Sequence, residues 1–404
     1  MLSVHEARER ILSRFEPTAT EGVPLTASAG RVLAVDIIAA HDLPLFDNSA
    51  MDGFAVRAED TSASGGTFAV VADIPAGSTP TVTLTTNEAA RIMTGAQIPA
   101  GADAVIAVED TDFNHREAGA SPPKTISFQK NVKAGENVRR RGMDIRAGEV
   151  VLKKGRLLKA QDMGLLAMLG IGSVQVHKKP RVALLSTGDE LLEVDAPLEA
   201  GKIRDSNSYT LAALIEAAGG KVLRLGVAKD RRDAVEGLLG QAAREEADVI
   251  LSSAGVSVGA FDFVKEVVEA NGRLDFWRVN MRPGKPLAFG DYAGRPFIGL
   301  PGNPVSAFVG FEVFVRPVIE RLSGRSDGGR PTVKVRSADE IESDGRESYL
   351  RARIREENGV PLASLTGHQG SGNLLSLVQA DALLIIPAGV KCVPAGQEVE
   401  AILL

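Results

Sequence analysis

The chain has 404 residues, a formal net charge of −6 at pH 7 and a hydrophobic fraction of 44%. At about 150 residues per domain, this length predicts two to four domains. The hydrophobic fraction argues against a disordered chain, and the mild acidity argues against a general nucleic-acid binder, which would carry a basic surface.

Cysteine content and hydropathy limit the class of protein further. The single cysteine, Cys392, excludes an intramolecular disulfide and a cysteine-based zinc site. No apolar run approaches the roughly 20 residues that span a bilayer, and the first residues lack the pattern of a signal peptide. We therefore expect a cytoplasmic protein that binds neither membranes nor nucleic acid.

The N-terminal half reads as a helix followed by a β-rich region. Ser3 and Glu6 have the spacing of a capping box, and apolar residues at helical spacing follow as far as Phe15. Residues 25–175 carry short alternating segments broken by Gly and Pro, which predicts mostly strands. One short helix is expected over 161–169.

From residue 181 the pattern changes to strands that alternate with helices. This alternation predicts an α/β domain with a mainly parallel sheet. The expected strands are 182–185, 222–227, 248–252, 276–281, 287–290 and 297–300, and the expected helices are 208–218, 232–244, 263–270 and 304–322. Residues 323–330 read as a linker. The strand-like segments 333–336, 349–354, 383–386 and 398–404 then predict a small C-terminal β domain.

Three loops of the α/β region, 186–190, 252–259 and 300–306, follow predicted strands and open helices. Ligands of open α/β sheets bind at this edge, where helix N-termini favour anions. Asn303 suits an N-cap and Pro304 the first helical position. Each loop alone could be an ordinary turn, but three together favour a ligand site. None is a Walker A or Rossmann motif, which disfavours a P-loop nucleotidase and a dehydrogenase.

Charged residues suggest what such a site would hold. The stiff turn 282–286 carries Arg282 and Lys285, a pair suited to phosphate or another oxyanion, although a solvated surface turn remains the alternative. Several carboxylates could bind Mg²⁺, an ion that is usually held by one or two carboxylates and by substrate phosphates. Each carboxylate alone could also be a turn former or a helix cap. We interpret the glycine-rich segment 366–372 as a surface loop, with contact between His368 and a ligand as the alternative.

Nine short segments occur in a characteristic order along the chain: 47–56, 93–96, 135–144, 187–191, 205–207, 255–259, 283–286, 302–306 and 370–372. In this order, they resemble segments of the molybdenum-insertion enzymes of molybdenum-cofactor synthesis, the bacterial MoeA proteins and the E domain of gephyrin. The similarity covers nearly the whole chain.

The resemblance implies four domains and a homodimer. An elongated N-terminal domain would comprise 1–46 and 141–177, with an inserted β-rich domain at 47–140. An α/β molybdopterin-binding domain would follow at 178–325 and a C-terminal β-barrel at 326–404. The active site would combine the α/β domain of one subunit with N-terminal domains of the other.

The implied reaction takes adenylylated molybdopterin and molybdate and yields molybdenum cofactor and AMP, with Mg²⁺ as cofactor. Phosphoryl chemistry needs positioning and charge stabilisation more than a protein nucleophile. The catalytic positions carried over are Asp52, Asp144, Glu190, Asp230 and Asp262, with Glu190, Asp230 and Asp262 as metal ligands. The substrate-binding positions are Thr94, Thr187, Gly188, Ser206, Ser252, Gly255, Ser257, Lys265, Arg278, Arg282, Lys285, Pro301, Gly302, Asn303, Pro304 and Ser306.

The chain departs from the family pattern at three positions. Ala254 stands where the family often has Gly, and we expect that residue 254 does not need a positive φ angle. Ala260 occupies an often acidic position, and Arg282 one that is often Lys.

The alternatives to a molybdenum insertase are a molybdopterin adenylyltransferase and a non-catalytic scaffold of the gephyrin E-domain type. Other proteins of the pathway are possible partners.

Overall fold

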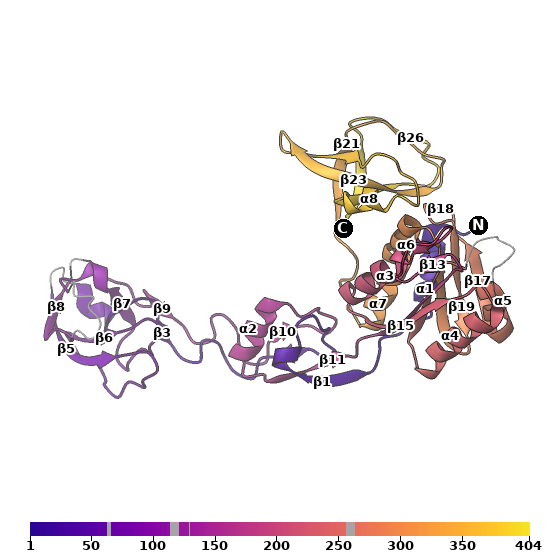
Figure 1. The fold of residues 1–404 in the computed structure, drawn as a ribbon. Helices are drawn as coiled ribbons and strands as arrows, with labels where there is room; N and C mark the ends of the chain where they lie inside the picture. The colour runs from indigo at the N-terminus through magenta and orange to yellow at the C-terminus, as the bar shows by residue number, and fades with distance from the viewer. Residues whose placement is uncertain (63–65, 114–120, 129, 256–262) are drawn as a thin grey trace. The chain divides into compact units, whose positions relative to one another are not determined.

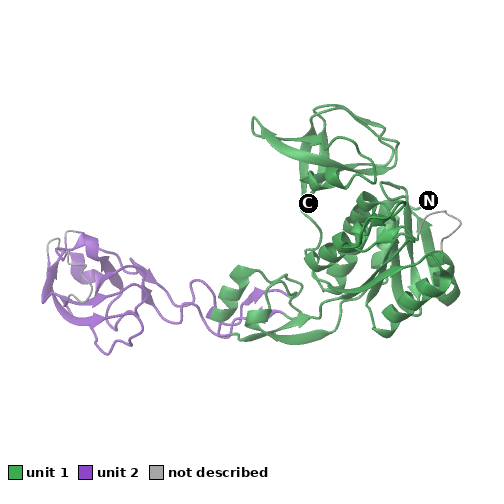
Figure 2. Ribbon diagram, in the orientation of Figure 1, with its two compact units in different colours: residues 1–35, 154–167, 171–404 green, residues 36–153, 168–170 purple. Residues whose placement is uncertain are grey.

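The computed structural model describes residues 1–62, 66–113, 121–128, 130–255 and 263–404. They fall into two units (Figure 2). Unit 2 contains residues 36–153 and 168–170, and unit 1 contains the rest of the described chain. Each unit is described by itself. No helix among the described residues is long and apolar enough to cross a membrane.

Unit 2 is built on a sheet of five described strands in the order β7-β4-β6-β5-β8. Apolar side chains alternate between its faces: Phe54 and Ile106 lie in one buried cluster, whereas Ala55 and Val105 lie in another. The strands are β4 (Gly53–Val56), β5 (Thr67–Ile74), β6 (Glu88–Ile92), β7 (Ala104–Ala107) and β8 (Thr125–Ser127). Two short ladders join β2 (Ile37–Ile38) to β10 (Val150–Leu152) and β3 (Asn48–Ser49) to β9 (Val138–Arg139), and single 3-10 turns lie at Ala58–Ser62 and Val108–Asp110.

Unit 1 begins with the expected capped helix, α1 (Val4–Leu12). The Ser3 hydroxyl accepts the backbone N–H of Glu6 across 3.2 Å, and the Glu6 carboxylate accepts that of Ser3 across 2.9 Å. Val4 and Ile11 face the core of the α/β domain. The 3-10 turn Leu25–Ala27 and the antiparallel pair β1 (Thr20–Pro24) and β11 (Ser173–His177) follow, with α2 (Ala160–Met168) between these two strands in sequence.

The sheet of the α/β domain has the strand order β15-β12-β16-β20-β19-β17 (Figure 1). The first four strands pair in parallel and the last two antiparallel, which confirms the predicted mainly parallel sheet. The strands are β12 (Arg181–Thr187), β15 (Lys221–Ala228), β16 (Val249–Ser253), β17 (Gly272–Arg278), β19 (Pro286–Tyr292) and β20 (Arg295–Leu300).

Helices cover both faces of this sheet. One face packs against α4 (Arg232–Arg244) and α5 (Phe263–Asn271), and the other against α1, α3 (Ser206–Ala217) and the helix that starts at Pro304. Because both faces are covered, the central strands β12 and β16 are almost wholly buried. A small parallel pair, β13 (Leu191–Leu192) and β14 (Ile203–Arg204), lies beyond the end of β12.

The helix predicted over 304–322 is divided into three parts. It runs as α6 (Pro304–Gly310), a π turn (Phe311–Val315) and α7 (Arg316–Leu322). Pro317 has no backbone N–H, so an uninterrupted α-helix would lack one hydrogen bond here. A wider turn before a proline is one way in which helices accommodate such a defect.

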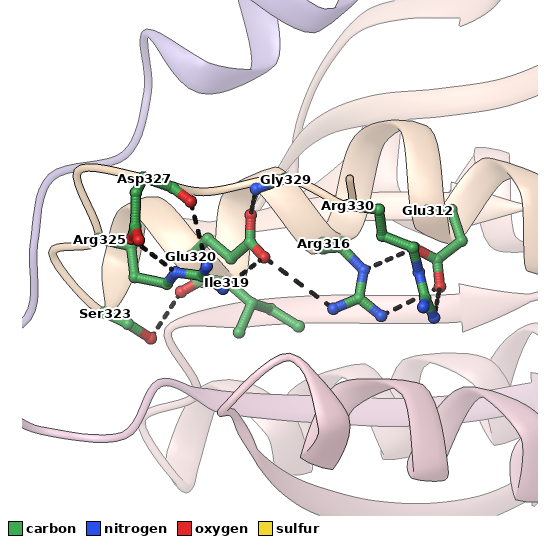
Figure 3. Close-up of polar contacts among 9 residues, drawn as sticks. All are labelled: Glu312, Arg316, Ile319, Glu320, Ser323, Arg325, Asp327, Gly329 and Arg330. Atoms are coloured by element: carbon green, nitrogen blue, oxygen red, sulfur yellow. Dashed lines mark hydrogen bonds and ion pairs between the residues drawn. The ribbon is translucent and has the colours of Figure 1, made fainter. Parts of the chain in front are cut away.

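Buried ion pairs fasten the linker after this helix to the helix itself (Figure 3). The Glu312 carboxylate accepts hydrogen bonds from Arg316 and, across 2.9 Å, from Nε of Arg330. Glu320 accepts hydrogen bonds from Arg325 across 3.0 Å and from the backbone N–H of Gly329 across 2.6 Å. The predicted linker is therefore held along its length.

The C-terminal domain is the predicted β-barrel. Its strands follow the order β23-β24-β21-β27-β25, and a further pairing of β25 with β23 closes the ring. They are β21 (Thr332–Ser337), β23 (Glu347–Glu357), β24 (Val360–Leu365), β25 (Ala382–Ile386) and β27 (Glu398–Leu403). Smaller elements are the pair β22 (Ile341–Glu342) and β26 (Cys392–Val393), the helix α8 (Leu374–Val378), and β18 (Met281–Arg282), which pairs with the start of β23.

Candidate functional site

A cavity of about 740 Å³ lies at the carboxyl ends of the parallel strands in unit 1. Loops after β12, β16 and β20, the turn 282–286 and the start of α3 line it, together with parts of the barrel. The structure brings together many of the positions named from the sequence. Those that line the cavity are Thr187, Glu190, Ser206, Gly255, Arg282, Lys285, Pro301, Gly302, Asn303, Pro304 and Ser306.

Among the described residues, four cations line this cavity: Arg204, Arg282, Lys285 and Arg346. Arg282 and Lys285 were predicted from the sequence, whereas Arg204 and Arg346 were not. Arg346 belongs to the barrel, 64 positions after Arg282. Arg346 donates to the backbone carbonyl of Met281 across 3.2 Å and to the Asp344 carboxylate across 3.0 Å. The barrel thus contributes a guanidinium next to the predicted cationic turn.

A second contribution from the barrel corrects the interpretation of 366–372 as a surface loop. His368 is exposed, but Gln369, Gly370 and Ser371 line the cavity. The loop stays in place because the buried guanidinium of Arg351 donates to the carbonyls of Gln369 and Gly370 across 3.2 and 3.0 Å. The sequence signal for this role was the glycine-rich loop itself, which permits close backbone approach.

Hydrogen bonds between neighbouring loops shape the polar side of the cavity. Asn207, in the first turn of α3, donates to the Ser253 hydroxyl and to the Gly302 carbonyl, each across 2.8 Å. It therefore ties together the loops that follow β16 and β20. Asp205 caps α3 by accepting the backbone N–H of Ser208 across 3.0 Å. Neither Asp205 nor Asn207 was named as a site residue, although both lie in the family-like segment 205–207.

Backbone conformation explains the small residues in two of these loops. Gly188 has φ +148°, and a Cβ atom there would lie 2.5 Å from a carboxylate oxygen of Glu190. Glycine therefore lets the Glu190 side chain fold against the backbone. The expectation for residue 254 is wrong, because Ala254 has φ +70° and pays a conformational cost that glycine would avoid.

Carboxylates gather at the rim of the domain near Glu190. Asp189 and Asp230 exchange hydrogen bonds, each backbone N–H donating to the other's carboxylate across 3.3 Å. Burial, together with the charges of Asp189 and Glu190, raises the pKa of Asp230. Carboxylate oxygens that disfavour each other's ionisation suit a hard cation such as Mg²⁺. Within the described part of the chain, however, no group of three His, Cys, Asp or Glu side chains is arranged to hold a metal ion.

Several named positions of unit 1 do not line the cavity. Gly188 and Asp230 lie beside it in the loops after β12 and β15, and Ser252 is fully buried in β16. Lys265 on α5 places its ammonium 5.5 Å from the Trp277 ring centre, and Arg278 is exposed at the end of β17. Ser257 and Asp262 lie outside the described residues.

The named residues of unit 2 form two exposed pairs. Asp52 accepts the backbone N–H and the hydroxyl of Thr94, each across 2.7 Å. Asp144 accepts a hydrogen bond from the Arg139 guanidinium across 2.6 Å. The structure therefore unites Asp52 with Thr94, 42 positions away, as residues of one local site.

Comparisons with known proteins match these features along the chain. Residues 2–170 match the family model described as MoeA N-terminal region (domain I and II), and residues 183–321 match the probable molybdopterin binding domain. Residues 334–404 match the MoeA C-terminal region (domain IV).

Similar proteins cover the whole chain. A protein of Nostoc sp. named "Molybdopterin molybdenumtransferase" is 40% identical over 94% of this chain and 88% of its own length. One of the same name from Haemophilus influenzae is 39% identical, over 99% of this chain and 98% of its own. The crystal structure of the molybdopterin biosynthesis MoeA protein from Pyrococcus horikoshii OT3 has a TM-score of 0.85 at 34% identity, covering 100% of both chains. The chain therefore belongs to the MoeA family of molybdopterin molybdenumtransferases.

Proposed function

We propose that this protein is a molybdenum insertase, which inserts molybdate into adenylylated molybdopterin and releases AMP. The observation that carries the proposal is the cavity at the strand ends, where Arg282, Lys285 and Arg346 converge in a chain of this family. Full-length relatives named molybdopterin molybdenumtransferase support it and do not favour an adenylyltransferase or a scaffold.

The chemistry of the cavity suits this reaction. Molybdate is a tetrahedral oxyanion and the substrate carries a diphosphate, so both need fixed cations and backbone amides. We assign anion binding to Arg282 and Lys285, with Thr187 and the 301–306 loop positioning the substrate. Phosphoanhydride cleavage depends mainly on charge stabilisation, so the site needs no protein nucleophile.

We further propose that Mg²⁺ acts as cofactor near Glu190 and Asp230. Their carboxylates would hold the ion together with substrate phosphates, and Asp262, outside the described residues, is a third candidate ligand. The ion would offset negative charge on the diphosphate. The raised pKa of Asp230 supports this assignment, because a cation there would relieve the repulsion among the carboxylates.

We also propose that the chain forms a homodimer and that Asp52, Thr94 and Asp144 act in the active site of the partner. Complementation tests this directly. Mixed and refolded subunits of Asp52→Ala and Lys285→Ala, each inactive alone, should regain part of the activity. An inactive mixture whose dimers have formed would place these residues in the same subunit's site, or outside it.

The domain limits inferred from the resemblance stay predictions: 1–46 with 141–177, 47–140, 178–325 and 326–404. The roles of Ser252, Ser257, Lys265 and Arg278 in substrate binding stay predictions too, as do a cytoplasmic location and further protein partners from the pathway.

The function is tested by AMP release. Purified protein receives adenylylated molybdopterin and Mg²⁺, with and without molybdate. AMP that appears only with molybdate, together with active cofactor, supports the insertase. Tight substrate binding without AMP release would instead support a carrier or scaffold.

A further inference from the structure

One carboxylate of the barrel contacts two of the four cations that line the cavity among the described residues. Asp344 Oδ2 accepts hydrogen bonds from Nε of Arg346 across 3.0 Å and from a second guanidinium nitrogen of the same side chain across 2.5 Å. Its Oδ1 accepts the backbone N–H of Arg346 across 3.1 Å. Nη1 of Arg282 lies 3.9 Å from Oδ2. Asp344 therefore links the guanidinium of the barrel to that of the α/β domain.

The Arg346 guanidinium is also held from another side. Its remaining nitrogen, Nη1, donates to the backbone carbonyl of Met281 across 3.2 Å. Met281 belongs to β18, which pairs with the first residues of β23. The planar group is thus oriented by a carboxylate and a carbonyl before any ligand arrives, so less conformational freedom remains to be lost on binding.

We propose that Asp344 is a positioning residue that orients the guanidiniums of Arg282 and Arg346 for a tetrahedral oxyanion in the cavity. The inference rests on the proposed function in taking molybdate as that anion. Hydrogen bonds from Arg346, together with the charges of Arg346 and Arg282, lower the pKa of Asp344, so the carboxylate is ionised at neutral pH.

Positioning and simple charge make opposite predictions for Asp344→Asn. A carboxylate beside an anion site repels the anion, so loss of its charge alone would tighten binding. Asn keeps one oxygen acceptor but loses the ionic contacts, so both guanidiniums are less firmly oriented and binding weakens. The sign of the change in affinity therefore separates the two roles.

The test is calorimetric titration of the full-length protein with sodium molybdate. Asp344→Asn should weaken molybdate binding by about tenfold, the equivalent of ~1.4 kcal/mol. Glu398→Gln is the matched control, because Glu398 pairs with Lys334 across 2.9 Å on the same barrel and is not among the described residues that line the cavity. It should bind like the wild type. Unchanged or tighter binding by Asp344→Asn overturns the inference.

A double variant makes the test independent of a fold defect. In an Arg346→Ala background, Asp344→Asn should have much less effect than in the wild type, because most of the coupling passes through Arg346. A full additional loss in that background would show that Asp344 acts through the fold and would overturn the inference.

Kinetics give a further readout that a structural role would not move. Asp344→Asn should raise the KM for molybdate more than it lowers kcat. The titration needs no turnover, so it separates failure of this inference from failure of the proposed function. A wild type that binds molybdate but releases no AMP would contradict the proposed function, and the titration of Asp344→Asn would still decide the inference. A wild type that binds no molybdate overturns the inference itself.

Discussion

Val305 donates its backbone N–H to the carbonyl of Ser371 across 3.0 Å. Val305 lies in the first turn of the helix that follows β20, and Ser371 lies in the glycine-rich loop of the barrel. Since both residues belong to elements that line the cavity, this bond joins the α/β domain to the barrel at the site itself. Changes deep in the barrel should therefore reach the cavity.

Arg351 offers the first test of that coupling. It is fully buried and donates to three carbonyls of the loop, those of His368, Gln369 and Gly370, and to the Ser376 hydroxyl. Arg351→Leu leaves those groups unpaired and should cost about 1–3 kcal/mol of stability. Activity should fall further, because residues 369–371 are no longer held. Urea unfolding and AMP release measure the two effects.

Arg353→Leu is the control for this change. Arg353 lies on the same strand but is exposed, and it donates to the Gln379 carbonyl across 2.9 Å. It should keep both stability and activity. Equal losses of stability and activity in the two variants would show that both substitutions disturb the barrel in general, and that the contacts of Arg351 with the loop have no specific effect.

Substitution of Asp230 should have opposite effects on stability and on activity. Burial, Asp189 and Glu190 raise its pKa, so the folded state favours the protonated form. That contribution to stability is present at acid pH and is lost as the pH rises through the raised folded-state pKa. Asp230→Asn should therefore raise the Tm at pH 7 while it abolishes the Mg²⁺ dependence of AMP release.

The comparison variant is Asp233→Asn, three residues further along the chain. The Arg231 guanidinium lowers the pKa of Asp233, so removal of the Asp233 carboxylate should not raise the Tm. An Asp230→Asn protein with a lower Tm, or with normal Mg²⁺-dependent turnover, would contradict the proposed role.

Ala254 carries a conformational cost that a substitution can remove. Residue 254 has φ +70°, a region that only glycine adopts freely. Ala254→Gly should therefore stabilise the protein by up to about 1 kcal/mol. Thermal unfolding measures the change. Ala183→Gly, in the buried strand β12, should destabilise the protein instead, and the same sign in both variants would refute the strain at residue 254.

Glu312 should make the free energy of unfolding depend on pH in the acid range. Burial alone would raise its pKa, but hydrogen bonds from Arg316 and Arg330 outweigh burial and lower it. Its contribution is therefore present above the unfolded-state pKa of about 4.3 and is lost as the pH falls through the lower folded-state pKa. Glu312→Gln should cost about 3–5 kcal/mol at neutral pH.

Urea unfolding between pH 7 and pH 3 checks this prediction. The difference between wild type and Glu312→Gln should shrink as the pH falls. Glu266→Gln, which removes one member of the exposed pair with Arg232, should show no such trend. A difference that stays constant with pH would mean that Glu312 acts by packing alone.

Local signals predicted much of the fold. The helix expected over 232–244 is α4 with the same limits, and the capping box of Ser3 and Glu6 forms as expected. Both depend on spacing within one segment. The π turn at 311–315 and the strand β24 were not predicted, because the first depends on packing around Pro317 and the second has no clear alternation.

The candidate site was predictable where its loops follow strands of one sheet. The carboxyl ends of parallel strands meet at one edge, so Thr187, Gly255 and Gly302 could be grouped without coordinates. Arg346 and Ser371 could not, because only closure of the barrel brings them to that edge.

The most direct test of the whole account compares molybdate-dependent AMP release in the wild type, Lys285→Ala and Lys334→Ala. Lys285 lines the cavity, whereas Lys334 lies on the exposed outside of the barrel. Release is expected from the wild type and from Lys334→Ala, and little or none from Lys285→Ala. Normal release by Lys285→Ala, or release that does not depend on molybdate, would contradict it.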